Sequence, residues 1–328
     1  VIEGENLSYD QLPTKDKITN DEIDTFCRQL YEDALNEVQD SERIKIKEVK
    51  KGQLLSWQLI KEDKNDFFAC HGLKILRGDW IDGWHHYVQC AVFRGKTRGL
   101  FITKKDVAGT LYEQLNGAYN FVLQNIDIYT SFKGLKRIEE YELPTKSIRE
   151  VIANALCHRD YLQPSNIQVA IYEDRLEISS PGRLVNGITL ANIKSGVSKT
   201  RNRGIAETFA YMGVVEKWGS GIPNLYKEAK EFGLKNPVIE MLGDEFRVTI
   251  FRNRSRRTDL YGLSQSSNTV SEETTPLYKS MKHTNMGKES RTYNAIVANP
   301  TITIQELSKQ LTLSEKTINQ DLAALKKL

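Results

Sequence analysis

The chain has 328 residues, of which 39% are hydrophobic and 27% charged, a globular composition that excludes collagen, a coiled coil and wholesale disorder. The net charge of +3 is too small for the field of the whole molecule to indicate nucleic-acid binding, so any DNA contact must come from a local surface. No window reaches the roughly eighteen consecutive apolar residues of a membrane span, and no export signal opens the chain. We therefore expect a cytoplasmic protein without membrane contact.

Four cysteines, Cys27, Cys70, Cys90 and Cys157, lie far apart and form no CxxC pair. This spacing is typical of reduced thiols in a cytosolic protein rather than of a disulfide framework. The chain begins with Val1 in place of an initiator methionine, so we expect it to be a fragment of a longer protein.

The first hundred residues predict an α/β subdomain over 1–105. In residues 21–31, the spacing of Ile23, Phe26 and Leu30 gives one apolar face and predicts a surface helix. Three later segments have the β-branched and aromatic content of strands, namely 54–60, 86–93 and 98–102.

Residues 106–253 predict a second domain. Apolar residues at three- and four-residue intervals indicate a helix over 106–126, and another begins after Pro144 and runs to His158. Residues 166–172 and 175–179 alternate in polarity on either side of a two-residue turn, which predicts a hairpin, and 246–251 predicts a closing strand.

The composition changes beyond this domain. Residues 254–288 are first basic and then rich in Ser, Thr and Asn, which predicts a flexible linker. Residues 289–328 predict three short helices, at 293–298, 304–310 and 315–328, the second of them opened by a capping box from Thr303 to Glu306.

The last two of these helices fit a helix-turn-helix of the winged-helix type, whose wing is absent or truncated because it would lie beyond Leu328. The residues that cap or open its second helix are of types that contact bases or phosphates: Ser314, Lys316, Thr317, Asn319 and Gln320. A three-helix interaction module is the alternative interpretation, because acidic residues are mixed with the lysines of that helix.

A polar column marks the helix after Pro144. Glu150, Asn154 and His158 stand at i, i+4 and i+8 and therefore share one face, which could also be an ordinary solvated surface. Further on, Gly219-Ser220-Gly221 precedes another helix, where backbone N–H groups can meet phosphate oxygens. A plain loop that needs positive φ explains the glycines equally well.

Together these segments resemble the RecG-related transcriptional regulators, whose C-terminal module is a GHKL-type ATP-binding domain. The resemblance spans roughly residues 80–251 and rests on the segments Ile148–Tyr161, Ile171–Gly182 and Gly219–Ile222. It implies an α+β fold with a GHKL-like (Bergerat) sandwich. An AlbA-like domain, also seen in Schlafen proteins, is expected to precede residue 1 or to be absent.

The resemblance also implies roles for single residues. Glu150 matches the general base that orients the attacking water, and Asn154 matches the ligand of ATP-bound Mg²⁺. Residues 183–217 match the nucleotide lid. The implied cofactor-binding residues are Asn154, His158, Ser180, Gly182, Lys199, Arg201, Gly219, Ser220 and Gly221.

The sequence departs from the family pattern twice. Ser180 stands where GHKL proteins hold the adenine amino group with an aspartate, and the family's RNP segment is here Arg201-Asn202-Arg203. The resulting prediction is an ATP-binding bacterial transcriptional regulator that binds DNA and forms a homodimer or higher homo-oligomer. Its alternatives are a slow GHKL-class ATPase and a degenerate protein-interaction module that binds no nucleotide.

Two other kinds of site are less compatible with the sequence. Gly95-Lys96-Thr97 superficially resembles a Walker A motif, but strand rather than helix is predicted after it, so we expect no helicase motor. Zinc binding is a minor alternative, because the spacing matches no common finger; the residues concerned are Cys70, His71, His85, His86 and Cys90.

Overall fold

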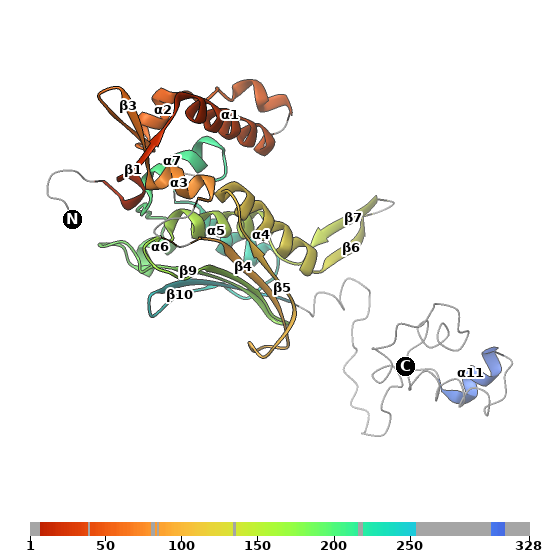
Figure 1. Ribbon diagram of the computed structural model, residues 1–328. Helices are drawn as coiled ribbons and strands as arrows, with labels where there is room; N and C mark the ends of the chain where they lie inside the picture. Colours follow the sequence, from red (N-terminus) through yellow and green to blue (C-terminus); the bar gives the residue numbers. More distant parts are fainter. Residues whose placement is uncertain are drawn as a thin grey trace. The chain divides into compact units, whose positions relative to one another are not determined.

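The computed structural model describes residues 7–38, 40–79, 83, 85–133, 136–215, 219–253 and 303–311. The chain forms two compact units, Val1–Ser264 and Gln265–Leu328. Within the second unit the described helix is α11 (Ile304–Leu311), which confirms the helix expected at 304–310 (Figure 1). In the part of the chain that the structure describes, no helix combines the length and the apolar character needed to cross a membrane.

The first unit begins with a small α/β layer. Its sheet has the antiparallel order β1-β3-β2. The predicted helix at 21–31 is confirmed as part of α1, and Ile23, Phe26 and Leu30 are buried. The elements of this layer are η1 (Tyr9–Gln11), β1 (Pro13–Ile18), α1 (Asn20–Glu37), η2 (Asp40–Lys45), α2 (Lys51–Ser56), β2 (Ile60–Asp63), β3 (Asp66–Cys70) and α3 (His71–Arg77).

The strand predicted at 54–60 is wrong, because α2 occupies the first part of that segment. The side chain of Gln53 accepts a hydrogen bond from the backbone N–H of Lys50 at 2.8 Å, which caps the helix. Gln58 then takes a positive φ of 57° and ends the turn. Leu54 and Leu59 are both fully buried on the two sides of this break, so the apolar run reflects burial rather than an extended backbone.

A six-stranded sheet of order β10-β11-β9-β8-β4-β5 forms the centre of the unit. Strand β4 runs parallel to β8, and the other described neighbours are antiparallel. The strands expected at 86–93, 98–102, 166–172, 175–179 and 246–251 are confirmed, whereas β10 was not predicted. The strands are β4 (Val88–Arg94), β5 (Leu100–Val107), β8 (Ile167–Ile171), β9 (Arg175–Pro181), β10 (Val238–Leu242) and β11 (Glu245–Phe251). This sheet crosses the position near residue 105 where we expected a domain boundary.

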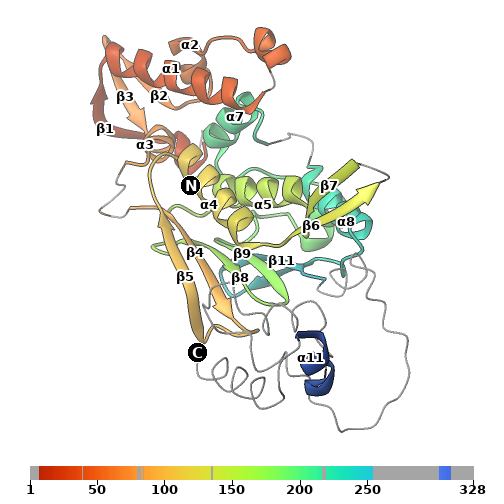
Figure 2. The ribbon, with the colours of Figure 1, turned by 90° about the vertical axis from the view of Figure 1, so that its right-hand side faces the viewer.

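Helices α4 (Leu111–Asn125) and α5 (Thr145–His158) lie over one face of this sheet, and a hairpin of β6 (Ile128–Lys133) and β7 (Lys136–Tyr141) joins them (Figures 1 and 2). Helix α4 begins later than the predicted residue 106, because β5 runs to Val107 and Thr110 is the N-cap. The predicted core stripe of α5, which includes Ile148 and Ile152, is buried.

Three helices follow β9: α6 (Leu190–Lys194), α7 (Arg203–Tyr211) and α8 (Gly221–Glu231). Ile205 and Phe209 of α7 are fully buried in the core, and the Asp10 carboxylate accepts a hydrogen bond from Ile205 N at 2.9 Å. The segment that matched the nucleotide lid therefore contains a core helix. Within the segment 183–217, residues 183–202 lie before α7 and are referred to below as the lid segment.

Candidate functional site

A cavity of about 350 Å³ lies between α5, α8, the helix-facing side of β9 and β11, and residues 183–203. Its size falls within the roughly 300–1,000 Å³ typical of small-molecule sites. The structure brings together at this cavity every residue that the resemblance implied, except Ser220, which is the N-cap of α8. They are Glu150, Asn154, His158, Ser180, Gly182, Lys199, Arg201, Gly219 and Gly221.

One end of the cavity is formed by α5 and the first turn of α8. A Cβ placed on Gly221 would lie 2.3 Å from Oε1 of Glu150 and 3.1 Å from Nδ2 of Asn154, so a larger residue would require these side chains to move. Because Gly221 opens α8, the unsatisfied N–H groups and the positive end of the helix dipole lie at this point. A carboxylate, an amide and a helix N-terminus thus converge on one end of the cavity.

Gly219 fixes the loop in front of α8. Its φ of +68° favours glycine, and a Cβ there would lie 2.1 Å from the carbonyl oxygen of Gly196. Gly196 belongs to the segment after α6 that we expected to form the lid. The loop before α8 and the lid segment therefore touch, backbone against backbone.

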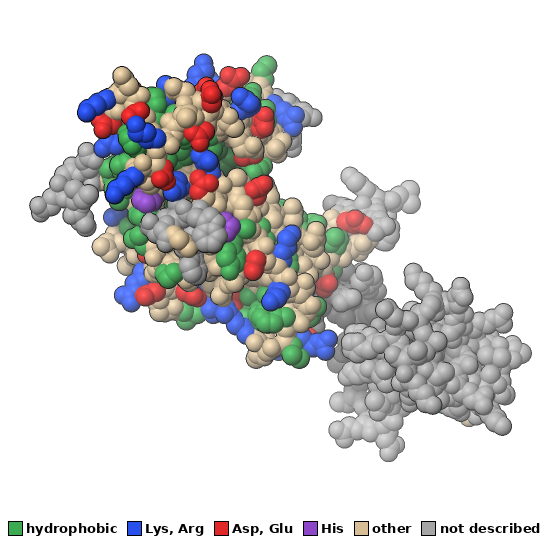
Figure 3. Space-filling model, in the orientation of Figure 1, with side chains coloured by type: hydrophobic (Ala, Val, Ile, Leu, Met, Phe, Trp, Pro, Cys, Tyr) green, Lys and Arg blue, Asp and Glu red, His purple; other side chains and the backbone are tan. Residues whose placement is uncertain are grey.

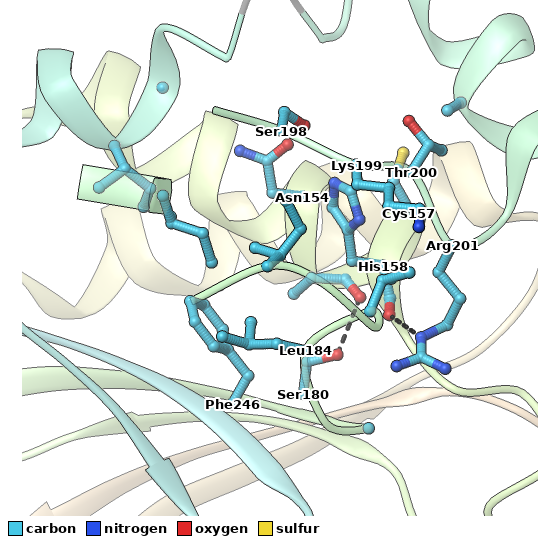
Figure 4. A pocket seen from close by; sticks show the side chains of 18 of the residues that line it. Asn154, Cys157, His158, Ser180, Leu184, Ser198, Lys199, Thr200, Arg201 and Phe246 are labelled. Carbon is cyan, nitrogen blue, oxygen red and sulfur yellow. Dashed lines mark hydrogen bonds between the residues drawn. The ribbon is translucent and has the colours of Figure 1, made fainter. Parts of the chain in front are cut away.

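The opposite end of the cavity is apolar. In the β9–β11 ladder, Ser180 pairs with Phe246 and Ile178 with Val248, and all four residues line the cavity. Figure 4 shows Ser180, Leu184 and Phe246 together at this end, away from Asn154 and Ser198. A flat, uncharged molecule or part of a molecule fits such a surface.

Ser180 is the buried polar group of this apolar end. Its hydroxyl donates to the carbonyl oxygen of Ala155 in α5 at 2.9 Å (Figure 4). Since a serine hydroxyl has one proton and two lone pairs, Oγ can only accept a further hydrogen bond in this arrangement. The site therefore suits a ligand group that carries an N–H or O–H donor.

The turn after β9 requires Gly182. This residue has φ +120°, and a Cβ would lie 2.8 Å from Cβ of Asp160. Its N–H donates to the carbonyl oxygen of Asp244 at 2.7 Å, while Asp160 N donates to the carbonyl oxygen of Pro181 at 2.8 Å. The turn is thereby fixed against both the end of α5 and the β10–β11 hairpin.

His158 lines the cavity as a neutral imidazole. Burial, reinforced by the nearby Arg201 guanidinium, lowers the pKa of His158 to about 4. At neutral pH the ring can exchange hydrogen bonds with a ligand, but it brings no positive charge to it.

Arg201 and Asn202 attach the lid segment to the end of α5. Nε of Arg201 donates to the carbonyl oxygen of His158 at 3.1 Å, and the same guanidinium contacts the carbonyl of Arg183 (Figure 4). Asn202 is buried, and its Nδ2 donates to the carbonyl oxygens of Cys157 and Arg159 at 2.9 and 2.8 Å. These contacts give both residues a structural task.

Lys199 is differently placed. It is exposed, its Nζ donates to the carbonyl oxygen of Asn186 at 3.1 Å, and it forms no ion pair with any residue that the structure describes. Since its ammonium group has further donors, Lys199 can meet an anionic ligand without breaking an ion pair.

Sequence reasoning missed the apolar lining and one carboxylate, Glu207 of α7. The alternation in β11 places Phe246 and Val248 on the same face of the sheet, a signal that could have indicated two of the lining residues. Ile178 follows the alternation already seen in β9, whereas no period indicates these apolar residues of the lid segment: Leu184, Val185, Ile188, Ile193 and Val197.

The remaining candidate sites are placed as follows. Gly95-Lys96-Thr97 lies in the turn between the antiparallel strands β4 and β5, so it lacks the strand-loop-helix geometry of a Walker A motif. Among the residues with described positions, no group of three or more His, Cys, Asp or Glu side chains could hold a metal ion. All four cysteines are buried and free.

The capping box that opens α11 is confirmed. Thr303 N donates to Oε2 of Glu306 at 2.8 Å, and Glu306 N donates to Oγ1 of Thr303 at 3.3 Å. The expected linker at 254–288 and the expected DNA-binding residues lie outside the described residues; the latter are Ser314, Lys316, Thr317, Asn319 and Gln320.

Comparison with known proteins finds an ATPase-like domain in this region. Residues 165–250 match the family described as "Putative ATP-dependent DNA helicase recG C-terminal". The match includes Ser180, Gly182 and the Gly219–Gly221 loop, whereas Glu150 and Asn154 precede it. No curated protein matches the chain.

The fold is similar to that of the DIP2311 protein from Corynebacterium diphtheriae, known from a crystal structure. The TM-score is 0.59 at 19% sequence identity, and the similarity covers 97% of this chain and 60% of that chain. This chain therefore spans about three fifths of the length of that protein.

Proposed function

We propose that this protein binds Mg-ATP in the cavity between α5 and α8 and uses it to regulate DNA binding by the helix-turn-helix that the sequence predicts near its C-terminal end. The observation that carries the proposal is the contact of Gly221 with Glu150 and Asn154, because it joins a helix N-terminus to the two side chains needed for a metal-bound phosphate. The match of residues 165–250 to an ATPase-like domain supports the same ligand class.

The triphosphate would lie at the Gly221 end. Backbone N–H groups of the first turn of α8 would donate to its oxygens, and Lys199 would add a charge-assisted donor from the lid segment. Asn154 offers the amide oxygen that a hard cation prefers. A bound Mg²⁺ would neutralise part of the phosphate charge beside Glu150.

The base would lie between Phe246 and the apolar side chains at the other end. Ser180 would accept a hydrogen bond from its amino group, which is the task of the aspartate in the resembled family. This assignment follows from the direction of the Ser180 to Ala155 hydrogen bond, because that bond uses the only proton of the hydroxyl.

Regulation would act through the lid segment. Residues 183–202 are fixed at both ends by Arg201 and touch the Gly219 loop at Gly196. A triphosphate between this segment and α8 must change that contact, and such a change is the kind of rearrangement by which a nucleotide controls a second function. The second function proposed here is DNA binding, through the helix that the sequence predicts after Ser314.

The test is the melting temperature with and without excess Mg-ATP, for the parent and for Asn154→Ala. Ligand at a hundred times its Kd stabilises the native state by about 2.7 kcal/mol, so the parent should melt at a higher temperature. Asn154→Ala should lose most of this shift. Asn236→Ala is the matched control, because Asn236 is exposed and does not line the cavity.

No shift in the parent would contradict the proposal and would favour a degenerate domain that mediates protein contacts. An equal shift in the parent and in Asn154→Ala would contradict the role of Asn154 while leaving nucleotide binding intact.

Slow ATP hydrolysis is the second candidate function. It is favoured by the position of Glu150 at the phosphate end, where its carboxylate can orient a water as general base. Hydrolysis and regulation are compatible, since slow turnover would reset the nucleotide-bound state.

A further inference from the structure

A second surface of the first unit combines positive charge with exposed apolar side chains. It consists of the β4–β5 turn and the following edge strand, residues 94–105, which we name the basic hairpin. Its sequence, RGKTRGLFITKK, has five cations and no acidic residue: Arg94, Lys96, Arg98, Lys104 and Lys105. This local surface is therefore strongly basic although the net charge of the whole chain is only +3.

The cations of the basic hairpin are exposed and largely without counter-charges. Arg98 forms an ion pair with Glu177, at 3.6 Å. The other four make no ion pair and no side-chain hydrogen bond with the residues that the structure describes. Two acidic residues of the neighbouring β8–β9 hairpin, Asp174 and Glu177, contact Arg175 at 2.8 and 2.7 Å, and Asp106 follows Lys105 in β5.

Three consecutive apolar residues lie between these cations. Leu100, Phe101 and Ile102 are 66%, 60% and 62% exposed. They belong to β5, which is an edge strand of the six-stranded sheet, so neither a further strand nor the core covers them. In Figure 3, blue and green side chains lie close together at the lower end of the sheet.

The basic hairpin is hydrogen-bonded to the neighbouring β8–β9 turn. Glu173 N donates to the carbonyl oxygen of Gly95 at 3.0 Å, and Arg175 donates to that of Lys96 at 3.1 Å. Nε of Arg98 donates to the Tyr172 hydroxyl at 2.9 Å. A surface already held by hydrogen bonds loses less conformational entropy when it binds a partner.

We propose that the basic hairpin is a second DNA-binding surface, which contacts the backbone of duplex DNA with Lys96, Lys104 and their neighbours and places Phe101 in a groove. Unpaired cations on an exposed surface complement the phosphate backbone, and the edge strand β5 carries the exposed Phe101 between them. This surface lies outside the nucleotide cavity and is distinct from the proposed helix-turn-helix.

Duplex DNA fits better than a single strand. Proteins that bind single strands stack successive bases on several aromatic side chains. Here Phe101 packs on Phe93 with ring centroids 4.8 Å apart, and Phe93 packs on Tyr172 at 5.0 Å. Phe93 and Tyr172 are only 6% and 1% exposed, so Phe101 alone of the three can reach a base.

The first experiment measures binding of the 328-residue chain to a fluorescent duplex of random sequence over a series of salt concentrations. For Lys96→Gln/Lys104→Gln, the slope of log K against log salt should fall by roughly 1–2, because each phosphate contact contributes about 0.9. Lys15→Gln/Lys61→Gln is the matched control, since it removes the same charge from exposed residues of β1 and β2. Its slope should equal that of the parent.

The second experiment locates the contact. The photo-crosslinking amino acid p-benzoylphenylalanine, placed at Phe101, should form an adduct with the duplex, whereas the same probe at the exposed Ile44 should form none. Binding through the helix-turn-helix alone would give equal salt slopes and no adduct at residue 101, and this result would overturn the proposal.

Other results would overturn it as well. If the parent does not bind the duplex, or if it crosslinks only to a single strand, duplex recognition by the basic hairpin is wrong. If the Lys96/Lys104 variant loses binding to phosphatidylglycerol vesicles while duplex binding stays unchanged, the surface is a membrane contact. All of these measurements are made without nucleotide, so failure here is separable from failure of the Mg-ATP proposal.

Discussion

The Ser180 hydroxyl and the backbone N–H of Arg159 donate to the same carbonyl oxygen, that of Ala155, at 2.9 and 3.1 Å. The carbonyl therefore keeps a hydrogen-bond partner when the hydroxyl is removed. This arrangement allows the proposed base-recognition role of Ser180 to be tested without leaving a buried acceptor unsatisfied.

Ser180→Ala should weaken ATP binding roughly tenfold, because one hydrogen bond to the base is lost. Inosine triphosphate carries a carbonyl in place of the amino group, so the parent should bind it more weakly than ATP, and Ser180→Ala should bind both equally. Isothermal titration with the two nucleotides measures the preference. A variant that keeps the preference of the parent would place the base elsewhere.

Glu150→Gln should lower the rate of ATP hydrolysis by roughly 10²–10⁴-fold, the range typical of a lost general base, while nucleotide affinity stays within a few-fold of the parent. Glu207→Gln is the matched control, because Glu207 is another carboxylate of the cavity lining. Phosphate release under single-turnover conditions is the measurement. If Glu207→Gln loses hydrolysis and Glu150→Gln does not, Glu207 of α7 is the general base.

Gly221→Ala should abolish the nucleotide-induced rise in melting temperature. The new methyl group would lie 2.3 Å from the Glu150 carboxylate and would force that side chain or the first turn of α8 to move. Gly52→Ala in α2 is the control, since no atom lies within 4 Å of a Cβ at that position. It should leave nucleotide binding unchanged and stabilise the fold by about 0.5–1 kcal/mol.

The free energy of unfolding should fall as the pH decreases from about 6.5 towards 4. The pKa of His158 is about 4 in the folded state and near 6.5 in the unfolded chain. Between these values the imidazole is protonated in the unfolded chain and neutral in the native state, so acid favours unfolding. The stabilisation from neutral His158 is thus fully present above pH 6.5 and is lost on acidification.

Urea denaturation at several pH values measures this dependence, and His158→Gln should reduce its slope. Buried His86, whose pKa is lowered to about 3, should account for part of the remaining slope. An unchanged slope in His158→Gln would show that the ring of His158 is solvated in the native state.

The polar face of α5 could be predicted because its spacing is local. Glu150, Asn154 and His158 repeat every four residues, and a helix of any origin places them in one column. What sequence could not indicate is the partner of that column. Gly221 meets Glu150 because α8 packs on α5, and no local pattern encodes a contact between residues so distant in sequence.

Two errors in the predicted elements have physical causes. In the segment 54–60, burial of both Leu54 and Leu59 produced an apolar run that a short helix and a strand explain equally well. Strand β10 was missed although Gly243 and Asp244 form a two-residue turn before β11, which is a recognised hairpin signal. The sequence of 54–60 is ambiguous between helix and strand, whereas the turn at Gly243-Asp244 could have predicted β10.

The parallel pairing of β4 with β8 also determines when the chain can fold. It joins Val88 to Ile167 across the two covering helices and the β6–β7 hairpin, so the ends of a long loop must meet before the central sheet closes. Contacts between such distant residues slow folding. During synthesis, β4 and β5 leave the ribosome well before β8, so the edge of β4 that pairs with β8 stays unpaired until β8 is made. We expect chaperone dependence and aggregation to concentrate in that interval.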